Sequence, residues 1–247
     1  MTYTMTVSPD FPPKKIAGWY IFNTWFQKQF GINVRLKLFN SFEEQREAIR
    51  NDEIDIIYAN PFDASMLVRE KGFIALARPA HKSDEAMVVV HAENPAAEIE
   101  DLQPGLRLAA TDDPDVYLMG MIMLEPAELN AENIHISRVD SYPLVAKALI
   151  NGDADVGFFL SDAFTALTNL TKSQLKVLVE SQIGVIQHLF LVGPRLAEKS
   201  DEIRVEIAKM HTHPKGKDAV NSLGFELCED VTPEDVEFMI DLMDTLV

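Results

Sequence analysis

Three carboxylates lie within four residues at one point of the chain, and together they could bind a cation. Asp112, Asp113 and Asp115 belong to the run Thr111-Asp-Asp-Pro-Asp115. Carboxylate oxygens attract protonated amines and are preferred ligands of hard metal ions. Acidic residues at the start of a helix also cap it and interact favourably with the positive end of its dipole. Both interpretations stay open, because one carboxylate can cap the helix while another contacts a ligand.

Aromatic side chains near the ends of the expected strands and helices form a second group. A box of aromatic rings attracts a protonated or quaternary amine through cation–π interaction, or stacks on a flat organic ligand. Packing in the core is the alternative, and it applies most to Tyr58 and Phe159, which lie inside expected strands. Tyr117 and Tyr142 stand beside polar turns and are the better candidates for a binding site. The whole group consists of Tyr20, Tyr58, Phe62, Tyr117, Tyr142 and Phe159.

Short polar side chains follow two of the expected strands and could orient the polar groups of a ligand. Ser8 and Asp10 follow the first strand, and Asn60 and Asp63 follow a later one. An ordinary helix start explains the same residue types equally well. The predicted ligand-binding residues are Ser8, Asp10, Tyr20, Tyr58, Asn60, Phe62, Asp63, Thr111, Asp113, Asp115, Tyr117, Ser141, Tyr142 and Phe159.

The sequence predicts no catalytic residue, no cofactor and no metal site. It contains no nucleophile motif, phosphate loop, dinucleotide fingerprint or zinc-protease motif. His211 and His213 stand close together, but two ligands without a third do not build a metal site, and histidines at a helix end complement its dipole. Cys228 is the only cysteine, so no intrachain disulfide can form, and we expect it to fill a small apolar space.

A repeated junction indicates how these side chains are positioned. Residues 51–63 run from a polar turn through Asp55 and a short apolar segment to Asn60-Pro61, where a strand must end and a helix can begin. Residues 151–162 repeat this order about a hundred residues later. Two such junctions predict two similar α/β lobes, each with polar groups at the sheet edge where small ligands bind in parallel sheets.

Hydrophobic periodicity predicts strands and helices that alternate along most of the chain. Ser41 with Glu44 forms a capping box, and Gly31 ends the first helix. The expected strands are residues 3–7, 33–39, 54–59, 73–77, 86–91, 106–110, 133–137, 155–159, 175–180 and 184–192. The expected helices are residues 14–30, 41–50, 61–71, 116–125, 142–151, 161–170, 195–211, 216–223 and 233–247.

This order predicts an α/β fold with two lobes, each a mixed, mainly parallel sheet flanked by helices. The chain is expected to leave its first lobe near residue 83 and to return near residue 186. Lobe 1 then consists of residues 1–83 plus 187–247, and lobe 2 of residues 84–186. Two connections of this kind are typical of a clamshell that closes on a ligand in the cleft between its lobes.

The bulk composition restricts the possible partners. The chain has 247 residues, of which 47% are hydrophobic, and a formal net charge of −17. That charge argues against nucleic acid or an anionic membrane as the main partner, because both select basic patches. No segment has transmembrane length, and the first residues lack the features of a signal peptide. We therefore expect a cytoplasmic protein, or a periplasmic one whose signal peptide has been removed.

The chain resembles the type II periplasmic solute-binding proteins of the phosphate/phosphite/phosphonate group. The resemblance covers essentially the whole chain, and it depends on the order and spacing of several short motifs. These are Ser8-Pro9 with an aromatic helix up to Gly31-Ile-Asn-Val34, Asp55-Ile-Ile-Tyr-Ala-Asn-Pro61, Thr111-Asp-Asp-Pro114, residues 141–157, and Asn221-Ser-Leu-Gly-Phe225. The resemblance implies the substrate-binding component of an ABC transporter, and a monomer.

Two departures from the family pattern affect the ligand. Phosphonate binders of this group continue after Asp-Pro with a Ser-Thr-Ser-Gly stretch, where this chain has Asp115-Val-Tyr-Leu-Met-Gly120. The family's Ser-His-acid sequence is Ser141-Tyr142-Pro143. The phosphonate-binding residues are therefore not retained, and a dianion is disfavoured beside several carboxylates.

We therefore expect a protein without enzymatic activity that closes its two lobes on one small molecule and is recognised by an ABC permease or a sensor protein. The alternatives are a cytoplasmic ligand sensor, a small-molecule enzyme on the same fold, and a module that binds only protein partners. A buried carboxylate beside a second titrating group would favour the enzyme.

Overall fold

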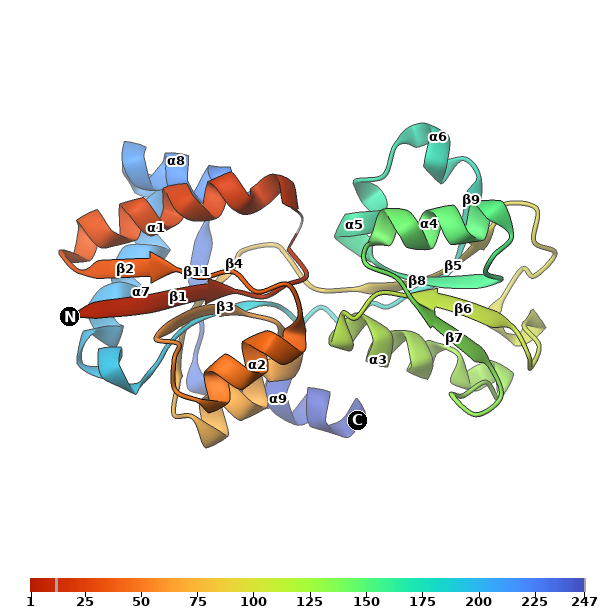
Figure 1. The fold of residues 1–247 in the computed structure, drawn as a ribbon, viewed down its shortest axis with the longest axis horizontal. Coiled ribbons are helices and arrows are strands. Elements are labelled where there is room, and N and C mark those ends of the chain that lie inside the picture. Colours follow the sequence, from red (N-terminus) through yellow and green to blue (C-terminus); the bar gives the residue numbers. More distant parts are fainter. Residues whose placement is uncertain (12, 247) are drawn as a thin grey trace. The chain divides into compact units, whose positions relative to one another are not determined.

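The computed structural model describes residues 1–11 and 13–246, and its contacts divide the chain into two compact units. Unit 1 consists of Met1–Lys82 and Gln187–Asp244, and unit 2 is built on Ser83–Ile186. Each unit is an α/β structure around its own sheet (Figure 1). None of the helices in the described ranges is long and apolar enough to cross a membrane.

The sheet of unit 1 has the strand order β11-β4-β10-β3-β1-β2. β1 pairs in parallel with β2 and with β3, while β10 lies antiparallel between β3 and β4. β11 pairs antiparallel with the edge of β4. The strands are β1 (Thr2–Val7), β2 (Asn33–Leu36), β3 (Ile56–Ala59), β4 (Ile74–Pro79), β10 (Leu189–Val192) and β11 (Cys228–Asp230).

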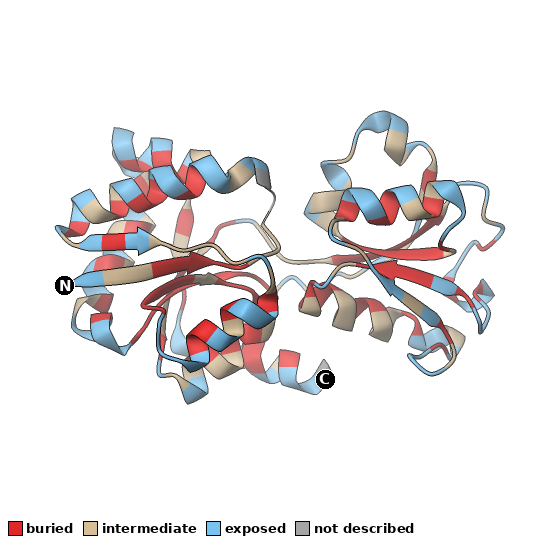
Figure 2. Ribbon diagram, in the orientation of Figure 1, coloured by how far each residue is buried: buried red, intermediate tan, exposed pale blue. Residues whose placement is uncertain are grey.

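Helices cover both faces of this sheet and bury two separate cores (Figure 2). One core contains Phe22 and Phe26 of α1 together with residues of α7 and α8. The other contains Ile49 of α2 and Ile240 of α9. The helices are α1 (Ile16–Phe30), α2 (Phe42–Arg50), α7 (Ser200–Lys209), α8 (Pro214–Ser222) and α9 (Pro233–Leu246), with 3₁₀ or π turns at η1 (Pro13–Lys15), η2 (Pro61–Asp63), η3 (Met66–Glu70), η6 (Pro194–Lys199) and η7 (Met210–Thr212).

The sheet of unit 2 has the strand order β7-β6-β8-β5-β9, with β5 antiparallel to both of its neighbours. Gly157 lies against Val145 and Leu149 of α4, whereas the next residue, Phe158, lies against Gly120 of α3. Since alternate strand residues face opposite sides, α3 and α4 cover the two faces. The elements are β5 (Ala86–His91), β6 (Arg107–Ala110), β7 (His135–Arg138), β8 (Val156–Leu160), β9 (Leu175–Glu180), α3 (Pro114–Met123), α4 (Tyr142–Asn151), α5 (Ser161–Thr165), α6 (Asn169–Lys172), η4 (Ile99–Asp101) and η5 (Glu125–Ala127).

The two units share one topology. The order β2-β1-β3-β10-β4 in unit 1 corresponds to β7-β6-β8-β5-β9 in unit 2, including the parallel and antiparallel pairings. In unit 2 only β5 runs against the other described strands, and in unit 1 only β10 and β11 do so. The predicted α/β class with mixed, mainly parallel sheets is confirmed, and the repeated junction in the sequence reflects this shared topology.

Several predicted elements differ from the structure at their ends. The strand expected over residues 184–192 is limited to Leu189–Val192. Before it, the Ile183 and Gly184 N–H groups donate to the Glu85 carboxylate and not to a neighbouring strand. The helix expected over residues 61–71 is a 3₁₀ turn followed by a π turn. The helix expected over residues 161–170 is split into α5 and α6, with Thr168 capping the second. β11 was not predicted, and it is only three residues long.

Candidate functional site

In unit 1, polar side chains converge at the edge of the sheet where β1 and β3 end. Ser8 and Asp10 follow β1, and Asn60 follows β3 directly. β10 runs antiparallel to β3 and pairs Leu189 with Ala59. The residue before β10, His188, is therefore brought to the same edge from the opposite direction.

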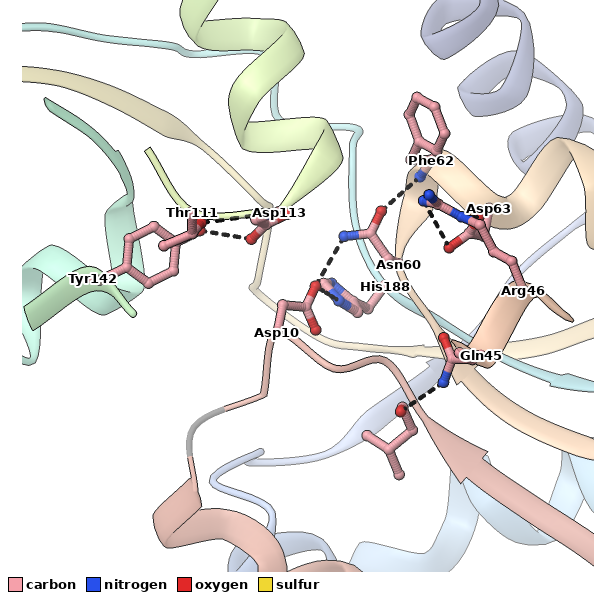
Figure 3. Close-up of polar contacts among 11 residues, drawn as sticks. Asp10, Gln45, Arg46, Asn60, Phe62, Asp63, Thr111, Asp113, Tyr142 and His188 are labelled. Carbon is pink, nitrogen blue, oxygen red and sulfur yellow. Dashed lines mark hydrogen bonds and ion pairs between the residues drawn. The ribbon is translucent and has the colours of Figure 1, made fainter. Parts of the chain in front are cut away.

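Asp10 is the centre of this cluster (Figure 3). Its Oδ2 accepts a hydrogen bond from Asn60 Nδ2 at 2.8 Å and lies 2.9 Å from His188 Nε2. The Asp10 side chain is only 5% exposed. Burial raises the pKa of Asp10, but the charge and hydrogen bond of His188, with hydrogen bonding from Asn60 and Ser8, outweigh burial and lower it. Asp10 is therefore an ionised, buried carboxylate.

Ser8 and Tyr58 complete this edge of unit 1. Ser8 N donates to Tyr58 O at 2.8 Å, which fixes β1 beside β3. The Ser8 hydroxyl faces Asp10, yet its buried Oγ makes no hydrogen bond of good geometry among the described residues. The Tyr58 ring is stacked on His188 with a centroid distance of 5.1 Å and an interplanar angle of 19°. It also contacts Phe190 and Trp19, so Tyr58 joins the edge to the aromatic core.

The residues after Asn60 have a largely structural role. Asn60 Oδ1 accepts the Phe62 backbone N–H at 2.9 Å and caps the turn. Asp63 forms an ion pair with Arg46, with 2.6 Å between Oδ1 and Nε, and its side chain is 4% exposed. Burial raises the pKa of Asp63, against the opposing effect of Arg46. The Arg46 guanidinium also lies over the Phe62 ring, 5.0 Å from its centroid. Asp63 and Phe62 thus hold α2 on the turn after β3.

Tyr20 is not part of this cluster. It lies on the outer face of α1 and is 54% exposed. The buried residues of the same helix are those that face the sheet, among them Trp19 and Phe22.

Unit 2 has an equivalent edge, where β6 ends and α3 begins. Asp113 is the residue before α3, but its side chain makes no capping hydrogen bond to that helix. Instead, Asp113 Oδ2 accepts a hydrogen bond of 2.6 Å from the Tyr142 hydroxyl, and both side chains are buried (Figure 3). Burial and then the charge of Asp113 raise the pKa of Tyr142 well above its ordinary value, so the phenol stays neutral. Capping thus does not account for the Asp113 carboxylate.

Further side chains surround this pair in unit 2. Phe159 is fully buried and stacks on the Tyr142 ring, with 5.9 Å between centroids and an angle of 27°. Tyr117 lies under the Arg138 guanidinium at 3.7 Å, and Arg138 Nη1 donates to Thr111 O at 2.5 Å.

The other predicted residues of this edge lie at helix starts. Asp115 is buried in the first turn of α3, where an acidic side chain interacts favourably with the helix dipole. Ser141 is the residue before α4, and its side chain makes no capping hydrogen bond.

The strand register makes Asp10 and Asp113 equivalent. Met5 pairs with Ile56 as Leu108 pairs with Val156. Asp10 lies five residues after Met5, and Asp113 lies five residues after Leu108. Each unit therefore presents one buried carboxylate at the same point of its fold, held by a side chain from another segment.

The acidic residue of the repeated junction has a different role at the opposite edge. Asp55 Oδ2 accepts the Thr4 backbone N–H at 2.8 Å, and Asp155 Oδ2 accepts that of Arg107 at 2.8 Å. Each aspartate also pairs with an arginine, Asp55 with Arg195 and Asp155 with Arg107. These two aspartates hold neighbouring strands together at their amino ends. The aspartate of the repeated junction therefore has a structural role in both units.

Sequence reasoning missed two residues at these edges. His188 is not among the predicted site residues, because the strand expected over residues 184–192 places it inside that strand; a strand that starts at Leu189 places His188 at the edge. Arg138 is the last residue of β7, paired with Ala110, and only knowledge of this register places it beside Thr111.

Two α/β units of one topology, each with a buried carboxylate and hydrogen-bonding side chains where its parallel strands end, define a two-domain solute-binding protein. The chain belongs to the family described as "ABC transporter, phosphonate, periplasmic substrate-binding protein", whose model matches residues 5–236. The resemblance seen in the sequence is thus confirmed. No curated protein matches the chain.

Several solved structures have a similar fold. PhnD1 from Prochlorococcus marinus, in complex with methylphosphonate, has a TM-score of 0.84 at 13% identity, covering 99% of this chain and 98% of that one. A binding protein component of an ABC phosphonate transporter from Pseudomonas aeruginosa has a TM-score of 0.76 at 14% identity, covering 98% and 87%. The aliphatic sulphonate binding protein SsuA from Escherichia coli has a TM-score of 0.64 at 12% identity, covering 99% and 86%.

Asp10 beside His188 is the kind of pair that favoured the enzyme alternative, but the family is one of solute-binding proteins for transport, so the chain is a ligand-binding protein and not an enzyme. Membership implies a small-molecule ligand and association with an ABC transporter permease.

Proposed function

We propose that this protein binds a small molecule with a protonated or quaternary amine, in place of a phosphonate, and delivers it to an ABC permease. The position and burial of the Asp113 carboxylate are the observation that carries the proposal. Asp113 stands at the start of α3, where phosphonate binders of the family supply donors, and it is a buried carboxylate that does not cap the helix. A carboxylate there attracts a cation and repels a dianion.

The rings around Asp113 support the same ligand class. Tyr142 supplies an aromatic ring beside Asp113, and such rings attract ammonium groups in a partly dehydrated site. Tyr117 is the second proposed ring, with Arg138 over one of its faces. Because the pKa of Tyr142 is raised, its hydroxyl donates to Asp113 without adding a second negative charge.

Unit 1 supports the proposal through Asp10. Its lowered pKa keeps this second carboxylate ionised. His188 and Asn60 orient the carboxylate, and Ser8 supplies a buried hydroxyl beside it. We propose that Ser8, Asp10 and Asn60 contact the polar part of the ligand, and that Thr111, Asp115, Ser141 and Phe159 contribute from unit 2. Of the remaining predicted residues, Tyr58, Phe62 and Asp63 support these contacts, and Tyr20 is the weakest candidate.

We also propose the domain arrangement expected from the sequence, with lobe 1 formed by residues 1–83 plus 187–247, lobe 2 by residues 84–186, and the ligand held in a cleft between them. The protein would act as a monomer and would not bind nucleic acid, in keeping with its net charge of −17.

A thermal-shift and calorimetric screen tests the ligand class. The panel contains alkylamines, betaines, alkylphosphonates, phosphate and small carboxylates, at concentrations up to a hundredfold above the dissociation constant of any hit. At that excess a specific ligand adds about 2.7 kcal/mol of stability. An amine or betaine that raises the melting temperature, with phosphonates silent, supports the proposal. A phosphonate that binds while all amines fail overturns it.

The variant Asp113→Asn tests the residue assignment. Loss of one charge-assisted contact of about 1.5–3 kcal/mol weakens binding of the amine by roughly 10- to 150-fold. Asp112→Asn is the matched control, because Asp112 is the exposed neighbour in the same turn and should leave the affinity within about twofold. Equal affinities of both variants would contradict the role of Asp113.

A further inference from the structure

The chain passes between its two units through two segments, residues 82–85 and 181–188. Neither belongs to a regular strand or helix. The two segments are hydrogen-bonded to each other at Asp84, whose N–H donates to Ile186 O at 2.7 Å. Ser181 N donates to Ala86 O at 2.9 Å at the end nearer the sheet of unit 2.

Glu85 makes the strongest connection between these segments. Its carboxylate accepts hydrogen bonds from the Ser181 hydroxyl, from Ile183 N at 3.1 Å and from Gly184 N at 2.7 Å. Burial raises the pKa of Glu85, but hydrogen bonds from Ser181, Gly184, Ile183 and Ser83 lower it further than burial raises it. The Glu85 carboxylate thus accepts backbone N–H groups that would pair with a neighbouring strand if this segment were part of a sheet.

Gln187 makes a corresponding connection inside unit 1. Its side-chain amide is buried, and with the amide nitrogen assigned to the side of Lys82, it donates to Lys82 O at 3.0 Å and accepts from Arg78 Nη1. Arg78 is held in turn by Glu229, with 2.7 Å between Nε and Oε1. The two segments are therefore joined to each other by hydrogen bonds within unit 1, through Gln187, and within unit 2, through Glu85 and Asp84. The peptide bonds Lys82–Ser83 and Ile186–Gln187 lie between these two sets of hydrogen bonds.

We propose that Glu85 is a positioning residue that makes the two connecting segments bend as one piece. With the carboxylate in place, residues 181–186 are fixed to unit 2, and movement of one unit against the other is restricted to rotation about the backbone φ and ψ bonds of Lys82, Ser83, Ile186 and Gln187. Without it, an irregular stretch that contains Gly184, at φ +73°, becomes an independent flexible connection. The proposal concerns the protein without ligand and does not depend on which ligand it binds.

Double electron–electron resonance between spin labels on the two units tests this proposal. Lys28→Cys on α1 and Lys147→Cys on α4 place labels at exposed positions of regular helices, and the native Cys228 is buried and does not compete. In Glu85→Gln the distance distribution should be at least about twofold broader than in the labelled parent. Glu93→Gln is the matched control, because Glu93 is an exposed glutamate of unit 2, and it should leave the distribution unchanged.

Hydrogen exchange distinguishes coupling of the two connecting segments by Glu85 from stabilisation of residues 183–184 alone. Glu85→Gln should accelerate exchange of the Ile183 and Gly184 amides whether or not the units move differently. Faster exchange with an unchanged distance distribution would overturn the proposal, because Glu85 would then stabilise only its own turn. If Glu85→Gln does not fold, Ser181→Ala removes one of the donors to Glu85, and its distance distribution should be broader than that of the parent but narrower than that of a flexible connection. An unchanged distribution in Ser181→Ala would then overturn the proposal.

Discussion

Replacing Asp55 with asparagine should destabilise unit 1 far more than the equivalent change at Asp155 destabilises unit 2. The two aspartates accept the same backbone hydrogen bond at 2.8 Å and pair with an arginine each. They differ in exposure, because the Asp55 side chain is 2% exposed and that of Asp155 is 41% exposed. Water can reach the carboxylate itself only at Asp155.

The magnitudes follow from this difference. A hydrogen bond to a charged group contributes about 1.5–3 kcal/mol, and asparagine keeps one oxygen for Thr4 N while losing the charge that faces Arg195. Arg195 is 43% exposed and can be rehydrated, which limits the loss. We expect Asp55→Asn to cost about 2 kcal/mol. Asp155→Asn should cost below about 1 kcal/mol, as for other exposed ion pairs.

Urea unfolding measures both changes. The only two tryptophans, Trp19 and Trp25, lie on α1, so their fluorescence reports on unit 1, while far-UV circular dichroism reports on both units. With a denaturant dependence of about 2 kcal/mol per molar urea, Asp55→Asn should lower the fluorescence midpoint by roughly 1 M. A shift under about 0.3 M, or an equal shift in Asp155→Asn, would refute the argument from burial.

Three further predictions follow from single contacts. Gly157→Ala should destabilise unit 2 by about 1–3 kcal/mol, measured by circular dichroism, because a Cβ there would lie 2.7 Å from Val145 Cγ1; a neutral result would mean that α4 can move away. In an absorbance titration at alkaline pH, one tyrosine should ionise well above the ordinary tyrosine pKa of 10.0, and Tyr142→Phe should remove this late step. Since the pKa of Asp10 is lowered on folding, its contribution to stability is complete above the ordinary value of 3.8 and is lost as the pH falls below it. In Asp10→Asn the free energy of unfolding should therefore decrease less steeply below about pH 4 than in the parent protein. The same decrease in both proteins would contradict the pairing of Asp10 with His188.

Local signals in the sequence were sufficient for much of the fold. α4 begins at Tyr142 and ends at Asn151 as predicted, because a polar turn precedes it and Gly152, at φ +74°, ends it. The capping residue of α2, Ser41, accepts Glu44 N at 3.2 Å. Helix caps and alternating apolar residues act within a few positions, so they can be recognised without knowledge of distant contacts.

Errors arose where distant residues decide the structure. Residues 184–192 together are apolar enough to predict one strand, but Glu85, about a hundred positions earlier, accepts the N–H groups of Ile183 and Gly184. His188 was missed for the same reason. Likewise, the sequence left open whether Asp113 caps α3, because only the tertiary structure brings Tyr142 to it.

The central position of β10 also has a consequence for the order of folding during synthesis. Unit 2 is essentially one continuous segment, so all five of its strands have been made by residue 180. The sheet of unit 1 cannot join β3 to β4 until β10 has been synthesised, since β10 is the strand that separates them. The unit that starts first is therefore completed last. For that period β3 and β4 expose unpaired edges, and these are the part of the nascent chain most in need of protection from aggregation.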